Sequence, residues 1–126
     1  MALKVELRPH ERIIIGSCVI TNTDQRARLL IDGDRIPILR EKDILTAETA
    51  NSPVKRLYLC VQQMYLEKDI PKYQELYMGF VRDLLEAVPS FRPEIEAASK
   101  LILSGSLYSS LKEIRKLIKR EEELLR

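Results

Sequence analysis

The sequence has few of the residues on which enzyme and metal sites usually depend. It contains one histidine, His10, and two widely separated cysteines, Cys18 and Cys60. It has no phosphate-binding glycine motif, no HExxH and no CxxC. One histidine in a turn, with no nucleophile or orienting group identified beside it, does not make a catalytic set. We therefore predict a protein that is not an enzyme, has no small-molecule substrate and carries no metal or cofactor.

Long hydrophobic runs are also absent. No run approaches the roughly 20 residues that a membrane helix requires, and residues 1–6 lack the apolar core of a signal peptide. We expect a cytoplasmic protein with no membrane contact. In that compartment both cysteines should be reduced and mostly buried thiols.

An excess of charge of one sign is missing as well. The 126 residues include 21 basic and 19 acidic side chains, a net charge of +2, and 45% of them are hydrophobic. This length and composition suit one compact domain or two small joined subdomains. Because the charge is balanced, binding to a nucleic acid would require a local basic cluster.

Residues 1–45 contain short runs of β-branched residues broken by turn residues, which predict antiparallel strands. The expected strands are Leu3–Leu7, Arg12–Ile15, Val19–Thr21, Ala27–Ile31 and Ile36–Leu39. The Asp32-Gly33-Asp34 segment is interpreted as a hairpin turn rather than a cation site. A five-stranded module of this size needs the helices, or a second copy of itself, for stability.

Residues 46–126 change to a helical period and predict four helices. They cover Pro53–Glu67, the apolar series from Ile70 to Leu85, Pro93–Leu103, and the segment from Leu107 onward, which is expected to be the longest and most charged. Thr46–Thr49 is a linker with capping potential, and the charged face of the last helix is either solvated or a partner surface. The predicted fold class is α+β, with a β-module over 1–45 and a helical region over 46–126.

The β-module has an unusual basic composition. It contains six arginines but only two lysines; the arginines are Arg8, Arg12, Arg26, Arg28, Arg35 and Arg40. Arginine suits bidentate contact with phosphate and guanine and can stack on bases. The alternative is that these residues are strand-edge charges that oppose aggregation.

The whole chain resembles the FlbT family of flagellin regulators. The matching blocks are residues 3–7, 11–16, 19–22, 37–45 and 55–59. The resemblance implies a protein that associates with the 5′ untranslated region of flagellin mRNA and alters its translation and degradation, often as a repressor. It also implies FlaF, a small helical protein, as a partner.

Residues 3–45 show a second, weaker resemblance to the RNA-binding translational regulator CsrA. It implies RNA contacts from the first strand, at Val5 and Arg8, and from Arg40 at the end of the last strand. It also implies an intertwined dimer in which first and last strands pair between chains. Two departures stand out: Leu7-Arg8 replaces a pair of arginines, and His10 replaces a turn glycine.

We therefore predict an RNA-binding regulator of flagellin synthesis with RNA contacts at Val5, Arg8, Arg12, Arg28 and Arg40. The alternative is a helical adaptor or flagellin chaperone-like factor that acts with FlaF and affects mRNA only indirectly. The near-neutral charge favours this alternative, since helices with apolar faces suit helix-in-groove recognition.

Overall fold

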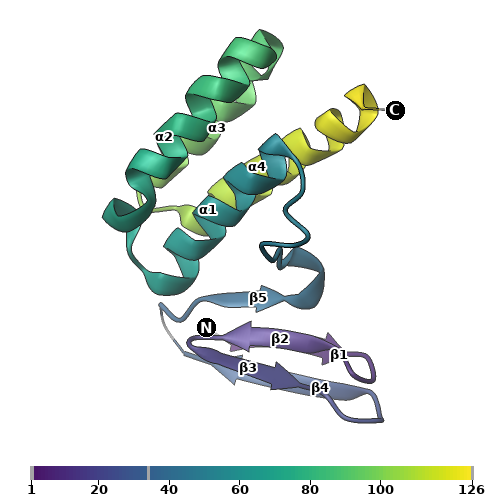
Figure 1. Cartoon of the computed structure of the whole chain (residues 1–126). Coiled ribbons are helices and arrows are strands. Elements are labelled where there is room, and N and C mark those ends of the chain that lie inside the picture. Colours follow the sequence, from purple (N-terminus) through teal and green to yellow (C-terminus); the bar gives the residue numbers. More distant parts are fainter. Residues whose placement is uncertain (1, 34, 126) are drawn as a thin grey trace. The chain divides into compact units, whose positions relative to one another are not determined.

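The computed structural model describes residues 2–33 and 35–125 and divides the chain into two compact units, one ending at Ile44 and one beginning at Leu45. The described residues form five strands and four α-helices, so the predicted α+β class is confirmed (Figure 1). No helix in these ranges is long and apolar enough to cross a membrane.

The first unit contains two small antiparallel sheets. Its strands are β1 (Ala2–Leu7), β2 (Arg12–Ile15), β3 (Cys18–Thr21), β4 (Ala27–Asp32) and β5 (Ile38–Arg40). One sheet pairs β1 with β4, and the other has the order β3-β2-β5. The expected strands are thus confirmed with small shifts at their ends, but they form two sheets rather than one five-stranded sheet. No solved structure matches the chain, and the likeness to CsrA stays a prediction.

Alternation along the strands builds the core of this unit. Val5 and Leu7 on β1 and Ile13 on β2 are buried together, and residues from both sheets pack against them. The intervening β1 residues Lys4 and Glu6 are exposed, as expected when successive side chains point to opposite faces.

Two tight turns position the ends of β2. Gly16 follows the strand at φ +62°, and its N–H donates to the Pro37 carbonyl at 2.8 Å. At the other end His10 also has a positive φ, 66°, and its N–H donates to the Thr23 carbonyl at 2.9 Å. A side chain at positive φ costs roughly 1–2 kcal/mol, which the surrounding hydrogen bonds offset.

The second unit is helical. It contains α1 (Pro53–Glu67), α2 (Ile70–Ala87), a 3₁₀ turn (Pro89–Phe91), α3 (Arg92–Leu103) and α4 (Leu107–Leu124). The expected first-turn prolines are confirmed in α1, α2 and α3. Asp69 caps α2 by accepting the Lys72 N–H at 3.2 Å. Helix α4 is not the longest, because α2 also has 18 residues.

Helix α1 lies against α2 and α4, and α3 lies against α4 (Figure 1). The helix contacts are apolar, with Leu57, Val61, Leu111 and Leu117 fully buried. Ser110 is also fully buried, and its hydroxyl donates to the Ala98 carbonyl at 2.9 Å. Burial of such side chains contributes roughly 1.5–3 kcal/mol each, so this unit has a substantial core of its own.

A carboxylate from α4 completes the start of α1. Glu121 is only 6% exposed; it accepts the Ser52 hydroxyl at 2.5 Å and the Val54 N–H at 3.0 Å. Ser52 in turn accepts the Lys55 N–H at 3.3 Å. The cap of α1 is therefore Ser52, while Thr46 and Thr49 bond to each other in a separate turn.

Two other sequence-based expectations need correction. The charged face of the last helix was expected to be either solvated or a partner surface, yet Glu121 is buried within the unit because it faces the first N–H groups of α1. Both cysteines are free, but only Cys60 is buried; Cys18 is exposed on β3. Burial raises the pKa of the Cys60 thiol to about 11.

Candidate nucleic-acid interface

The predicted arginines gather at one end of the first unit. Arg12 begins β2, and Arg40 ends β5, its antiparallel neighbour. Arg8 follows β1 in the turn that leads into β2, and Arg28 lies opposite Glu6, near the same end of β1. Strand pairing therefore places at one end arginines as far apart in the sequence as Arg8 and Arg40.

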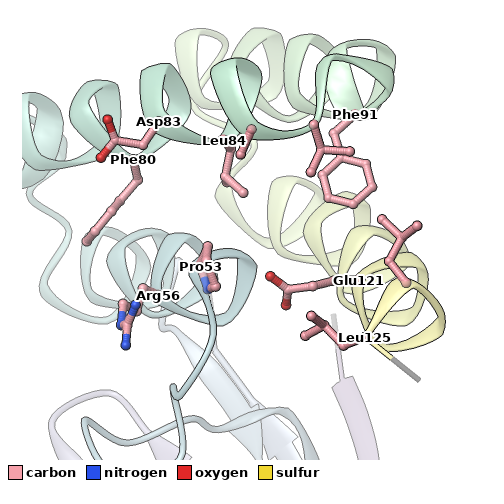
Figure 2. Close-up of a pocket in the computed structure, with 11 residues that line it drawn as sticks. Pro53, Arg56, Phe80, Asp83, Leu84, Phe91, Glu121 and Leu125 are labelled. Atoms are coloured by element: carbon pink, nitrogen blue, oxygen red, sulfur yellow. The ribbon is translucent and has the colours of Figure 1, made fainter.

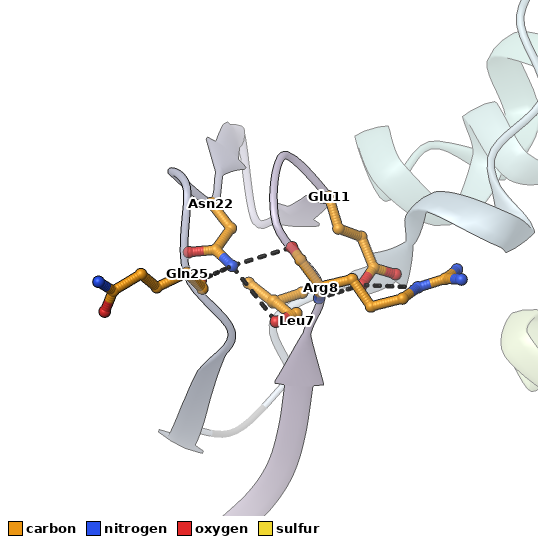
Figure 3. A network of polar contacts seen from close by, with 5 residues as sticks. All are labelled: Leu7, Arg8, Glu11, Asn22 and Gln25. Carbon is orange, nitrogen blue, oxygen red and sulfur yellow. Dashed lines mark hydrogen bonds and ion pairs between the residues drawn. The ribbon is translucent and has the colours of Figure 1, made fainter.

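The turn that carries Arg8 is held by a network of hydrogen bonds (Figure 3). The Asn22 side-chain amide donates to the carbonyls of Leu7, Arg8 and Gln25 at 3.2, 2.9 and 2.7 Å. The Arg8 N–H donates to the Glu11 carboxylate at 2.8 Å. Asn22 therefore ties the end of β1 to the loop before β4 and fixes the backbone position of Arg8.

Three of the arginines have acidic neighbours. Arg8 Nε lies 3.9 Å from Glu11 Oε1, Arg12 Nε lies 3.6 Å from Glu41 Oε1, and Arg28 Nε lies 3.3 Å from Glu6 Oε1. All three guanidinium groups are largely exposed. Exposed pairs of this kind are worth roughly 0–1 kcal/mol, so they leave the arginines available to a competing anion.

Arg40 differs from these three. No hydrogen bond or ion pair of its side chain occurs within residues 2–33 and 35–125. It pairs in register with Ile13, so it lies on the core-facing side of its sheet, whereas Arg12 points to the opposite side. The two arginines thus share an end of the sheet but not a face.

Val5 lies in a different environment from the arginines. Its side chain is 2% exposed and belongs to the core. The Val5 side chain is therefore not accessible to RNA in this structure. The sequence signal for this burial is the alternation of apolar and polar residues along β1.

The other polar candidates do not form a reactive group. His10 is exposed in its turn, and no cluster of three or more potential metal ligands occurs among the described residues. Asp34, which belongs to the predicted turn after β4, lies outside those residues.

Sequence reasoning missed the acidic partners and Asn22. Glu6 and Glu11 are close to arginines in sequence, but their pairing depends on strand register and turn geometry. Asn22 was recognised only as a turn residue. Its bonds to Leu7 and Arg8, 15 and 14 positions away, required the folded chain.

The described residues thus form two small sheets with exposed arginines and a separate helical unit. The comparisons give the family. The family described as "Flagellar protein FlbT" matches residues 3–125, and the chain belongs to it.

Curated relatives agree with this assignment. A protein of Rhodopseudomonas palustris named "Probable flagellum biosynthesis repressor protein FlbT" is 70% identical over 99% of this chain and 98% of its own length. A Bradyrhizobium diazoefficiens protein named "Probable flagellum biosynthesis repressor protein FlbT 1" is 62% identical over 98% of this chain and 85% of its own length. The "Flagellum biosynthesis repressor protein FlbT" of Caulobacter vibrioides is 30% identical over 99% of this chain and 90% of its own length.

Proposed function

We propose that this protein is a cytoplasmic repressor of flagellin synthesis that binds the 5′ untranslated region of flagellin mRNA and controls its translation and degradation. The flagellar role and its sign are supported by the family and by the names of the relatives. The observation that carries RNA binding is the group of Arg8, Arg12, Arg28 and Arg40 at one end of the β unit.

The balanced charge is compatible with this proposal. Three of the arginines lie beside carboxylates, which cancel their charge in the net value, but the three arginine side chains themselves stay largely exposed. A phosphate binds arginine in a bidentate, charge-assisted manner that is stronger than an exposed ion pair. RNA therefore displaces the glutamates at a small cost.

The chemistry of the β unit suggests how RNA would be held. Residues 1–45 contain no tryptophan, tyrosine or phenylalanine, so bases cannot stack on those rings there. Arginine guanidinium planes take that role and also bond phosphates. Single-stranded loops, whose bases are unstacked, are the fitting targets.

Open strand edges support the proposed dimer. Within the described residues β1 pairs only with β4, and β5 pairs only with β2. Strands β1 and β5 therefore each have one edge whose backbone groups lack a strand partner, and such an edge can pair with a strand of another chain. Pairing of β1 in one copy with β5 in another would give the strand order β4-β1-β5-β2-β3 and two RNA sites per dimer, raising apparent affinity.

Titration of flagellin leader RNA tests the proposal. The purified protein should bind the leader more tightly than a scrambled RNA, and the affinity should fall between roughly 50 and 200 mM salt. Arg40→Ala should weaken binding by roughly 5- to 100-fold, the loss expected for one arginine contact worth about 1–3 kcal/mol. Arg40→Lys should be intermediate, because it keeps the charge without the planar fork.

Arg82→Ala is the matched control, since Arg82 is an exposed arginine of the helical unit, and it should leave the affinity unchanged. Equal affinities for the wild type and Arg40→Ala would contradict the assignment of Arg40. Failure of the wild-type protein to select the leader RNA would contradict direct RNA binding.

The second candidate is a helical adaptor or flagellin chaperone-like factor that acts with FlaF. It is favoured by an apolar groove lined by α1, α2 and α4. On this view the effects on mRNA are indirect, and the purified protein alone would not bind leader RNA.

A further inference from the structure

The helical unit contains a groove with a volume of about 410 Å³ (Figure 2). Eight of its eleven lining residues are apolar. Its walls come from the start of α1, the second half of α2, the following 3₁₀ turn and the end of α4. The groove belongs to one unit and does not involve the arginines of the β unit.

The α2 wall has the spacing of a helix-binding surface. Phe80, Leu84 and Ala87 stand at positions i, i+4 and i+7 on α2 and all line the groove. They span about 10 Å at 1.5 Å per residue. Helices that dock in grooves use anchors with the same spacing, so the length of this wall fits two turns of a partner helix.

The α4 wall adds apolar surface that remains open. Leu124 and Leu125 are 62% and 73% exposed, and both line the groove. Together with the α2 row they supply five of the eight apolar residues that line the groove. An exposed apolar patch next to a concave surface marks an interaction site.

The polar groups of the groove argue against a small polar ligand. Glu121 lies in the lining, but its two oxygens already accept the Ser52 hydroxyl and the Val54 N–H. The other two polar residues, Arg56 on α1 and Asp83 on α2, are exposed. Small-molecule sites instead aim several polar groups inward.

Arg56 and Asp83 provide complementary charges for a macromolecular partner. Figure 2 shows them on different helices that border the groove. Within the described ranges neither side chain makes a hydrogen bond or an ion pair. The groove thus has a basic side and an acidic side, with apolar surface between them.

We propose that this groove binds an amphipathic helix of a partner protein. The helix places large apolar residues between α2 and α4, an acidic flank beside Arg56 and a basic flank beside Asp83. The proposal specifies a docking site and a partner chemistry for the adaptor function, and it does not depend on RNA binding by the β unit.

Three fluorescent helical peptides of about 18 residues test it, each with leucines at i, i+4, i+7 and i+11. One has a glutamate flank and a lysine flank, one has glutamates on both flanks, and one has lysines on both. Fluorescence anisotropy with the full chain measures the dissociation constants. The mixed-flank peptide should bind most tightly.

Charge-reversing variants of Arg56 and Asp83 should change which of the three peptides binds most tightly, in a direction fixed by the charge. Arg56→Glu gives two acidic sides and should favour the lysine peptide, whereas Asp83→Lys should favour the glutamate peptide. Each change should be roughly two- to five-fold, as for exposed ion pairs. This readout does not depend on which way along the groove a peptide runs.

A blocking variant tests the location. Ala87 is exposed in the groove, so the Ala87→Glu variant should fold normally. It should raise the dissociation constant of the mixed-flank peptide by about tenfold or more. Met78→Glu is the control, because Met78 is 54% exposed on the same helix but lies outside the groove. It should change the affinity less than twofold.

Absence of saturable binding by all three peptides, or binding that Ala87→Glu leaves unaltered, would overturn the proposal. A dimer in sedimentation experiments that Ala87→Glu dissociates would also overturn it, because a second copy would then occupy the groove. Leader RNA titrated against the same variants separates a failure of this site from a failure of RNA recognition.

Discussion

Removal of the Glu121 carboxylate should destabilise the helical unit more than removal of an exposed carboxylate on the same helix. Glu121→Ala deletes two charge-assisted hydrogen bonds, to the Ser52 hydroxyl and the Val54 N–H. Hydrogen bonds to charged groups contribute roughly 1.5–3 kcal/mol each. Because Ser52 still caps Lys55, we expect a net loss of about 2–4 kcal/mol.

Urea unfolding followed by far-ultraviolet circular dichroism measures this loss. A loss of 1 kcal/mol lowers Tm by roughly 4–8 °C in a unit of this size, so thermal unfolding should show a clear shift too. Glu121→Gln should lose less, since its carbonyl oxygen still accepts one bond. Glu122→Ala, at an exposed position on the same helix, should stay within about 0.5 kcal/mol.

The reasoning would be refuted if Glu121→Ala and Glu122→Ala had the same stability. The start of α1 would then be satisfied by Ser52 and solvent alone, and burial of Glu121 would contribute nothing to the unit. A change in the denaturant slope without a change in midpoint would instead indicate that the surface exposed on unfolding has changed or that unfolding is no longer two-state.

Two further predictions concern the β unit and the thiols. Asn22→Ala should lower the free energy of unfolding by about 1–3 kcal/mol, because three carbonyls lose their shared donor. Hydrogen exchange of the backbone amides of His10 and of residue 22 should accelerate. Unchanged protection of these amides would contradict this role. At pH 8 a thiol reagent should modify exposed Cys18 quickly and Cys60 only after unfolding. Because burial raises the pKa of Cys60 from 9.0 to about 11, the unfolded chain loses this proton first, so the thiol's contribution to stability should fall between about pH 9 and 11. Cys60→Ser should flatten the stability profile in that range, and a profile identical to the wild type would exclude the effect.

Local patterns predicted the elements of this protein well. The β-branched run of Arg12–Ile15 and the helix predicted over Pro53–Glu67 have the bounds that the structure shows, and the residue blocks identified the family. Such signals depend on neighbours in the chain, which a single sequence contains.

These local signals could not predict which strands and helices pair with one another. Nothing local shows that Leu3 lies opposite Ile31, so the division of five strands into two sheets was missed. The same holds for Glu121, which in a run of glutamates looks solvated and is buried only because α1 begins beside it. Residues placed by partners far along the chain could not be predicted.

The contact between Ser52 and Glu121 also constrains the order in which the molecule can fold during synthesis. The two residues are 69 positions apart, so α1 leaves the ribosome long before the carboxylate that completes its first turn. The β unit has all of its strands within the first 44 residues and can form early, since chains fold from the N-terminus as they emerge. A nascent chain therefore passes through a stage in which all five strands and α1 have emerged but the carboxylate that completes the first turn of α1 has not.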